Sequence, residues 1–196
     1  MTSMLETLRQ KWDARYGDTH DIPLPCHVLR EFAHLLPESG KALDLASGMG
    51  GNALLLAAHG LETTAWDLSP VGITKLRDHA SRQSLVIDAQ ARDVMAHPPE
   101  ANSFDVITVG YFLERDLFPA LLAALKPSGL LFYETFIRDK PEGTGPSNPD
   151  YLLEQNELLQ RCNSLVIRVY REEGRVGNAV KGCRNVAMLV GQKKDC

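Results

Sequence analysis

The segment Lys41 to Ala53, KALDLASGMGGNA, decides the fold of this chain. It begins with an apolar run that carries one acid, which fits a strand buried on both faces. The small residues Ser47 to Gly51 follow, and they let a backbone approach a ligand closely. Asn52 to His59 are then good helix formers, and Gly60 ends the pattern. The segment therefore predicts a strand, a tight turn and a helix.

A glycine-rich turn before a helix can bind an anionic group through its backbone. It points free backbone N–H groups, with the positive end of the helix dipole behind them, at whatever lies beyond the carboxyl end of the strand. The turn is thus predicted to be a cofactor cradle that prefers anionic groups.

Size and composition limit the possible functions. The 196 residues, 44% of them hydrophobic, can bury one sizeable core, so we expect one domain over residues 1–196. The net charge is −4 with no basic run, which argues against a nucleic-acid partner. An apolar signal core and a membrane-length apolar run are both missing from the sequence. The four cysteines have no CxxC spacing and favour reduced thiols over a metal site. We therefore expect a cytoplasmic protein without metal, membrane or nucleic-acid partners.

Residues 1–40 are expected to form a helical extension that packs on a core at 41–196. Apolar residues at helical spacing predict an amphipathic helix over residues 3–16, packed on something larger. These residues are Leu5, Leu8, Trp12 and Tyr16. We interpret Trp12 and Tyr16 as packing anchors rather than lid residues. A second helix is expected after Pro25, ending at Pro37.

From Lys41 onward, short apolar runs alternate with helical patterns. We expect strands at residues 41–46, 62–67, 85–88, 104–110, 130–136, 165–172 and 185–192. We expect helices near residues 50–59, 70–81, 116–126 and 151–161. This alternation implies right-handed crossovers and a mostly parallel sheet covered on both sides, a doubly wound α/β fold. The last two strands have only a glycine-rich loop between them, so we expect them to pair as an antiparallel hairpin.

Four features follow successive predicted strands and should meet at the carboxyl edge of the sheet. The first is the glycine turn after Asp44. The second is Asp67, placed where an acid accepts hydrogen bonds from a ribose diol. The third is Asp93, which can accept from the amine of an adenine, and the fourth is the end of the fourth strand. The candidate cofactor-binding residues are Asp44, Ala46, Ser47, Gly48, Gly50, Asp67, Leu68, Asp93, Val94, Gly110 and Tyr111.

In this order the residues resemble the class I S-adenosylmethionine-dependent methyltransferases. The matching segments are LDLASGMG (43–50), WD (66–67), RDV (92–94), FDVI and LKPSG. The resemblance is close over residues 41–136. It implies a Rossmann-like fold of seven strands, whose last strand inserts antiparallel between the fifth and sixth. The segments WDARYG and NPDYLLEQNELL are similar to small tellurite-resistance-type methyltransferases.

The resemblance implies methyl transfer to a small-molecule acceptor by in-line displacement, with S-adenosyl-L-methionine as cofactor. The sulfonium supplies the reactivity, so the protein has to position the acceptor and exclude water, and we assign no catalytic residue. The usual glycine two residues after the strand acid is Ala46 here; we expect binding to survive this change. No feature of the sequence predicts an oligomeric state.

Two other functions fit part of the pattern. Gly48, Gly50 and Ala53 spell GxGxxA ahead of Asp67, which also fits an NAD-dependent oxidoreductase. However, none of the five tyrosines has a lysine four residues later, as a short-chain reductase would want. The second alternative is a non-catalytic methyltransferase-like binding module.

Several candidate residues also have a purely structural interpretation. Asp44 can order the turn without touching a ligand, and Asp93 can be a solvated loop acid. Asp67 can cap the next helix, although Ser69 is the better N-cap. Arg115 and Glu134, near the ends of the fourth and fifth strands, can face a substrate or form salt bridges between loops. The loop at residues 137–150 is expected to cover a bound ligand.

Overall fold

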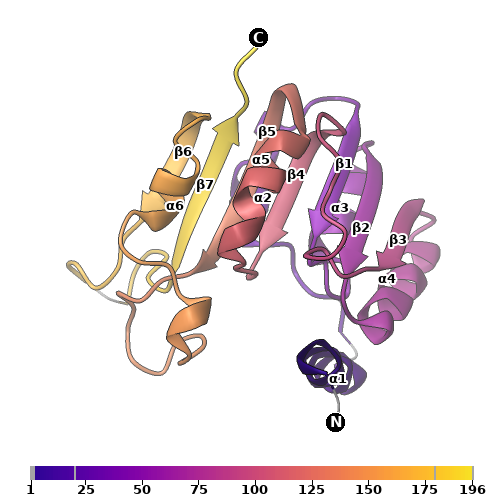
Figure 1. The fold of residues 1–196 in the computed structure, drawn as a ribbon, viewed down its shortest axis with the longest axis horizontal. Coiled ribbons are helices and arrows are strands. Elements are labelled where there is room, and N and C mark those ends of the chain that lie inside the picture. Colours follow the sequence, from indigo (N-terminus) through magenta and orange to yellow (C-terminus); the bar gives the residue numbers. More distant parts are fainter. Residues whose placement is uncertain (1–2, 20, 179, 196) are drawn as a thin grey trace.

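The computed structural model describes residues 3–19, 21–178 and 180–195, and it contains a seven-stranded sheet of order β3-β2-β1-β4-β5-β7-β6 (Figure 1). Strands β1 to β5 pair in parallel, whereas β7 runs antiparallel to both β5 and β6. The predicted topology, with an inserted antiparallel last strand, is confirmed. The strands are β1 (Lys41–Leu45), β2 (Glu62–Asp67), β3 (Ile87–Ala91), β4 (Phe104–Gly110), β5 (Leu125–Phe136), β6 (Val166–Glu172) and β7 (Val186–Gln192).

Helices cover both faces of this sheet. Helices α2, α3 and α4 pack on one face, and α5 and α6 pack on the other. In the described part of the chain, no helix is long and apolar enough to cross a membrane. The helices are α1 (Met4–Gly17), α2 (His27–Glu31), α3 (Gly51–Ala58), α4 (Pro70–Arg82), α5 (Phe118–Ala124) and α6 (Glu157–Arg161), with 3₁₀ turns η1 (Ala33–Leu35), η2 (Arg115–Leu117) and η3 (Pro149–Tyr151).

The first strand is buried on both faces, as its apolar run predicted. Ala42 packs into the cluster under α2 and α3, whereas Leu43 and Leu45 pack into the cluster under α5. All three side chains are fully buried. Because β1 lies inside the sheet between β2 and β4, the turn that follows it lies between the ends of those two strands at the carboxyl edge.

The third strand begins later than predicted. Residues 85–88 were expected to form it, but β3 covers Ile87–Ala91. The N–H of Leu85 donates to the carbonyl of Ala80 at 2.9 Å, so Leu85 closes the end of α4 instead. Val86 is exposed between the two elements. The apolar run therefore straddles a helix end and a strand start, which hydrophobicity alone does not separate.

The helix expected over residues 151–161 is mostly absent. The N–H of Leu153 donates to the carbonyl of Phe136, and the carbonyl of Leu153 accepts from the N–H of Arg138. These bonds hold Leu153 alongside the end of β5, so its backbone groups are unavailable to a helix. Only α6, from Glu157 onward, remains helical.

Two further helices are shorter than predicted. The helix expected after Pro25 stops at Glu31, because Phe32 has φ −111° and the chain continues as the 3₁₀ turn η1. The helix expected over residues 116–126 is the 3₁₀ turn η2 followed by α5, which ends at Ala124. Leu125 already pairs with Phe104 in the sheet, and this pairing ends the helix.

Helix α1 lies beyond the carboxyl ends of β1 and β2, next to α4 (Figure 1). It was expected to pack through an apolar face, but none of its residues is buried. Leu8, Trp12 and Tyr16 of the predicted apolar face are half-buried, and polar contacts also hold the helix. The Ser69 hydroxyl donates to the carboxylate of Asp13, and the ammonium group of Lys75 donates to the carbonyls of Tyr16, Gly17 and Thr19.

Candidate functional site

The glycine turn between β1 and α3 has an alternating left-handed backbone. Ala46, Gly48 and Gly50 have φ values of 58°, 54° and 89°. The N–H of Ser47 donates to the carbonyl of Trp66 at 2.9 Å, which fixes the turn against the end of β2. An added Cβ at Gly50 would lie 2.4 Å from the Cγ of Leu76, so only glycine fits there.

Ala46 is the strained position in this turn, so we expect its replacement by glycine to stabilise the protein. A left-handed conformation costs an L-residue about 1–2 kcal/mol, and glycine avoids most of that cost. Ala46→Gly should therefore raise the free energy of unfolding in urea by about 0.5–1 kcal/mol, after the larger chain entropy of glycine is deducted. The matched control is Ala53→Gly inside α3, which should lower stability by about 1 kcal/mol. A loss of stability in Ala46→Gly would contradict the strain argument.

Asp44 orders the start of α3. Its carboxylate is fully buried and accepts hydrogen bonds from the N–H of Ala53 at 3.0 Å and from the side-chain amide of Asn52 at 3.1 Å. Burial raises the pKa of Asp44 to about 7, although both hydrogen bonds act in the opposite direction. The contacts within the protein match its structural interpretation as the residue that shapes the turn.

Asp67 joins two turns at the end of β2. One carboxylate oxygen accepts from the N–H of Gly48 at 2.7 Å, and the other accepts from the N–H of Ser69 at 2.8 Å. Ser69 is the N-cap of α4, as predicted, because its hydroxyl accepts from the N–H of Gly72. Burial raises the pKa of Asp67. Each carboxylate oxygen keeps a second lone pair with which it can accept from a ligand hydroxyl. Leu68, the next residue, is half-buried.

Asp93 and Val94 follow β3. Asp93 accepts hydrogen bonds through Oδ1 from the N–H groups of Met95 and Ala96, at 2.9 and 3.3 Å, and so shapes its own turn. Val94 is buried in the core cluster that includes Trp66. The N–H of Arg92 donates to the carbonyl of Asp67 at 2.7 Å, which brings this turn next to the end of β2.

Gly110 is the last residue of β4, and Tyr111 follows it. An added Cβ at Gly110 would lie 3.1 Å from the side-chain nitrogen of Asn52 and 3.3 Å from the Cβ of Cys26. Tyr111 is half exposed, and its ring centroid lies 5.2 Å from that of Phe136. The structure thus brings the ends of β1, β2 and β4 together at one edge.

Known proteins are similar to this chain in sequence and in fold. The family model of a methyltransferase domain matches residues 42–129. A ubiquinone biosynthesis O-methyltransferase from Nitrosococcus oceani is 34% identical over 145 residues, which cover 68% of this chain and 60% of that protein. The protein of the same name from Coxiella burnetii is 34% identical over 102 residues, covering 50% and 44% of the two chains. The chain thus spans about half the length of the curated relatives it matches.

A solved structure has a similar fold over nearly the whole of this chain. TehB from Haemophilus influenzae superposes with a TM-score of 0.68 over 95% of this chain and 67% of that chain, at 21% identity. The chain belongs to the class I S-adenosylmethionine-dependent methyltransferases. Their cofactor is S-adenosyl-L-methionine, as the resemblance implied.

Tyr16 lies against the glycine turn, a position that the sequence did not predict. A Cβ at Gly48 would lie 2.9 Å from the Tyr16 hydroxyl oxygen, so the tyrosine lies directly against the glycine turn. Its ring stacks on Trp12 with centroids 5.6 Å apart. Burial, and then the charge of Asp67, raise the pKa of Tyr16, so it stays protonated at neutral pH. Tyr16 therefore contacts the site as well as packing with Trp12.

The loop after β5 also approaches α1. The ammonium nitrogen of Lys11 lies 5.7 Å from the ring centroid of Tyr151 and 5.9 Å from that of Trp12. Both α1 and this loop lie beyond the carboxyl ends of the parallel strands (Figure 1). This is the edge at which residues 137–150 were expected to emerge.

Arg115 and Glu134 have different environments in the methyltransferase. The Arg115 guanidinium donates to Glu157 at 2.8 Å and to the carbonyls of Asp150 and Leu152 at 2.9 Å each, so it fastens the loop after β5. A salt bridge was one of the two expected roles, and here it joins η2 to the start of α6. Together with Arg161, Arg115 lowers the pKa of Glu157 to about 2 against the effect of burial. Glu134 is fully buried and accepts from the N–H of Val28 at 2.6 Å.

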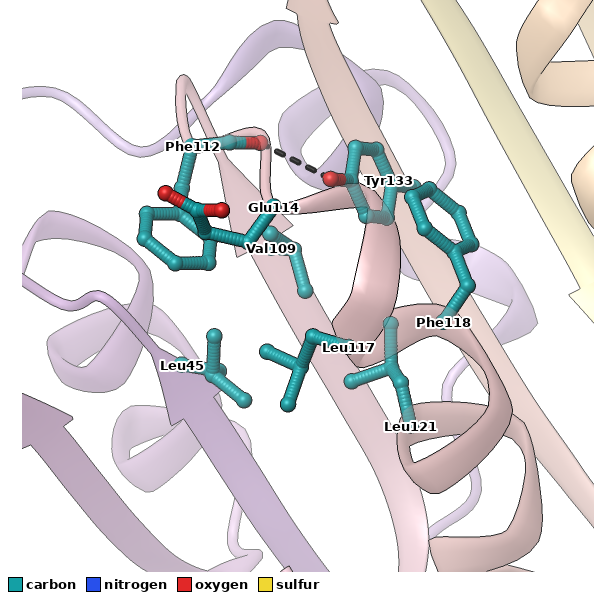
Figure 2. A pocket seen from close by; sticks show the side chains of 8 residues that line it. All are labelled: Leu45, Val109, Phe112, Glu114, Leu117, Phe118, Leu121 and Tyr133. Atoms are coloured by element: carbon teal, nitrogen blue, oxygen red, sulfur yellow. Dashed lines mark hydrogen bonds between the residues drawn. The ribbon is translucent and has the colours of Figure 1, made fainter. Parts of the chain in front are cut away.

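A small apolar pocket lies beside β4, but it belongs to the core. It is enclosed by Leu45, Val109, Leu117, Phe118 and Leu121 with Phe112, Glu114 and Tyr133 around them (Figure 2). The hydroxyl of Tyr133 donates to the carbonyl of Phe112 at 2.8 Å. The space does not admit a molecule the size of water. The pocket is therefore an imperfection of core packing and has no room for a ligand.

Proposed function

We propose that this chain transfers the methyl group of S-adenosyl-L-methionine to a small-molecule acceptor by in-line displacement. The observation that carries this proposal is the hydrogen bond from Gly48 to Asp67, which joins the glycine turn to the acid at the end of β2. When bound, the cofactor supplies an electrophilic methyl group on a sulfonium. The chain's own residues hold the two reactants in line and exclude water.

The glycine turn fits the methionine part of the cofactor. The hydroxyl of Ser47 is buried and has no hydrogen-bond partner among the described residues, so a ligand group would satisfy it. Gly48 has no side chain that would collide with the Tyr16 hydroxyl, and the N-terminus of α3 favours a carboxylate nearby. Asp44 holds this turn in shape. Ala46 and Gly50 supply its left-handed backbone.

The two acids that follow β2 and β3 fit the nucleoside. Asp67 has lone pairs left for the ribose hydroxyls, with Leu68 next to it. Asp93 uses Oδ1 for its own turn and leaves Oδ2 for the adenine amine, with Val94 under the ring. Gly110 and Tyr111 flank the point where the methyl group would lie, because β4 is next to β1 in the sheet.

The proposal extends to the whole chain as a single methyltransferase domain acting in the cytoplasm. The three cysteines within the described part of the chain, Cys26, Cys162 and Cys183, are free thiols, which suits a reducing compartment. The net charge of −4 supports a small acceptor rather than a nucleic acid.

Isothermal titration separates this function from that of an NAD-dependent oxidoreductase. We expect S-adenosylhomocysteine to bind with a Kd on the order of micromolar, about −8 kcal/mol, and NADH not to bind. The reverse preference would refute the methyltransferase proposal.

Two matched variants test whether Asp67 contacts the bound S-adenosylhomocysteine. Asp67→Ala should weaken S-adenosylhomocysteine binding by about 1.5–3 kcal/mol, because hydrogen bonds to a charged group are lost. Asp88→Ala removes the same charge from an exposed position on the neighbouring strand β3 and should leave affinity unchanged. If the two variants behave alike, Asp67 does not contact the ligand.

A further inference from the structure

The ring of Tyr16, near the end of α1, lies in a notch formed by two glycines. A Cβ at Gly48 would lie 2.9 Å from the Tyr16 hydroxyl oxygen, and a Cβ at Gly72 would lie 2.9 Å from its Cδ2. Gly48 belongs to the turn after β1, whereas Gly72 lies in the first turn of α4. A larger residue at either position would collide with the ring. The two glycines therefore give α1 a specific docking place on the candidate site.

Polar contacts keep α1 in this place. The ammonium group of Lys75, on α4, donates to three backbone carbonyls at the end of α1 and just after it. The Ser69 hydroxyl donates to the carboxylate of Asp13. No residue of α1 is buried. A segment with little buried apolar surface opens locally at a low free-energy cost. Helix α1 therefore belongs to the part of the fold that can open without unfolding the sheet.

On its other side, α1 reaches the loop after β5. The ammonium nitrogen of Lys11 lies 5.7 Å from the ring centroid of Tyr151. Arg115 holds this part of the loop, because it donates to the carbonyls on both sides of Tyr151. Helix α1 thus contacts α4, which follows β2, and a loop that follows β5. The glycine turn follows β1, which lies between β2 and β5 in the sheet. The contacts of α1 therefore lie on both sides of this turn.

The chain is attached to the core again before α2 begins. A Cβ at Gly51, the first residue of α3, would lie 2.7 and 2.8 Å from the carbonyl oxygens of Pro23 and Leu24. The N–H of Cys26 donates to the side-chain oxygen of Asn52 at 2.8 Å. None of these contacts involves α1. The chain from Pro23 onward can therefore stay in place while α1 moves.

We propose that α1 is a lid over the cofactor site, and that ligands enter and leave this site only when Tyr16 moves out of its notch. This inference rests on the proposed function, in which S-adenosyl-L-methionine lies on the glycine turn and at Asp67. Tyr16 contacts Gly48, and the N–H of Gly48 donates to Asp67. The closed lid excludes water from the reacting groups, and its opening controls the release of S-adenosylhomocysteine.

The contacts that close this lid lie within the protein. Lys75 binds the end of α1 and not the ligand, so it stabilises the closed lid equally in the free and in the bound protein. Weakening this contact should raise the rates of ligand association and dissociation together and leave the Kd almost unchanged. A residue that only contacts the ligand has a different signature, because its loss raises the dissociation rate alone and weakens binding.

Stopped-flow measurements of tryptophan fluorescence test the lid with S-adenosylhomocysteine as the ligand. Lys75→Met should raise the association and the dissociation rate constants by about 10-fold or more, because hydrogen bonds from a charged group are lost. The Kd should change less than about threefold. Lys193→Met is the matched control. The ammonium group of Lys193 also donates to backbone carbonyls, those of Ala123 and Leu125, at the opposite edge of the sheet. This variant should leave both rate constants unchanged.

A second variant and a second measurement make the test independent of Lys75. Tyr16→Ala empties the notch and should also raise the association rate constant. Hydrogen exchange followed by mass spectrometry should show that bound S-adenosylhomocysteine slows exchange of the α1 amides in the wild-type protein.

Three results would overturn the lid and leave the proposed function standing. They are an association rate constant that neither variant raises, a dissociation rate constant that rises alone, and exchange of α1 that binding does not slow. If S-adenosylhomocysteine does not bind the wild-type protein, the proposed function itself fails.

Discussion

Replacing Gly50 with alanine is expected to lower the free energy of unfolding by about 2–5 kcal/mol. The new Cβ would lie 2.4 Å from Cγ and 2.6 Å from Cδ1 of Leu76, which is fully buried. Overpacking of this kind costs about 1–3 kcal/mol. The backbone adds about 1–2 kcal/mol, because φ is 89° at this position. Urea denaturation of wild type and variant measures the sum.

Gly60→Ala separates the two contributions. Gly60 also has a positive φ, 103°, but an added Cβ there would find nothing closer than 3.8 Å. This control should lose only the backbone contribution, about 1–2 kcal/mol. Equal losses in the two variants would show that Leu76 gives way and that the turn does not depend on this close contact.

The second large effect is a pH dependence of stability that the burial of Asp44 should cause. Its pKa is about 7 in the folded protein, against 3.8 without the fold. Because the folded value is the higher one, this group stabilises the protein fully below pH 4 and loses that contribution as the pH rises to about 7. Three pKa units correspond to a change on the order of 4 kcal/mol.

Asp44→Asn removes this titration and keeps a side-chain oxygen that can accept from Ala53. Its stability relative to wild type should therefore rise between pH 5 and pH 8, measured by urea denaturation at both values. Asp105→Asn is the control. The pKa of Asp105 is lowered by hydrogen bonds from Lys126 and Lys41, so this carboxyl is charged in both states over that range. A constant difference between wild type and Asp44→Asn would contradict the burial argument.

The sequence predicted the order and direction of the strands well, for a physical reason. Buried strands need apolar runs, and the crossovers between parallel strands are restricted in hand. The predicted element boundaries are wrong where backbone N–H and C=O groups form hydrogen bonds with residues outside the local sequence pattern. Leu153 pairs with the end of β5 and Leu85 closes α4, so the adjacent helix and strand are shorter or shifted.

The sequence predicted those parts of the candidate site that lie at the ends of adjacent parallel strands. The glycine turn and Asp67 follow adjacent strands, so they had to meet at one edge. The roles of Tyr16 and Glu134 depend on contacts between distant segments, and no local pattern marks them. Tyr16 reaches Gly48 because polar contacts of Asp13 and Lys75 fix α1 on α4.

Strand β7 completes the sheet late, because it lies between two strands that are synthesised before it. This strand is made after the other six, yet it lies between β5 and β6, and β6 has no other neighbour in the sheet. Until residues 186–192 leave the ribosome, β5 presents an open edge to other chains, and β6 has nothing to pair with. Nascent chains should therefore be most prone to aggregate while β6 has been made and β7 has not, and chaperones should matter most for this half of the sheet.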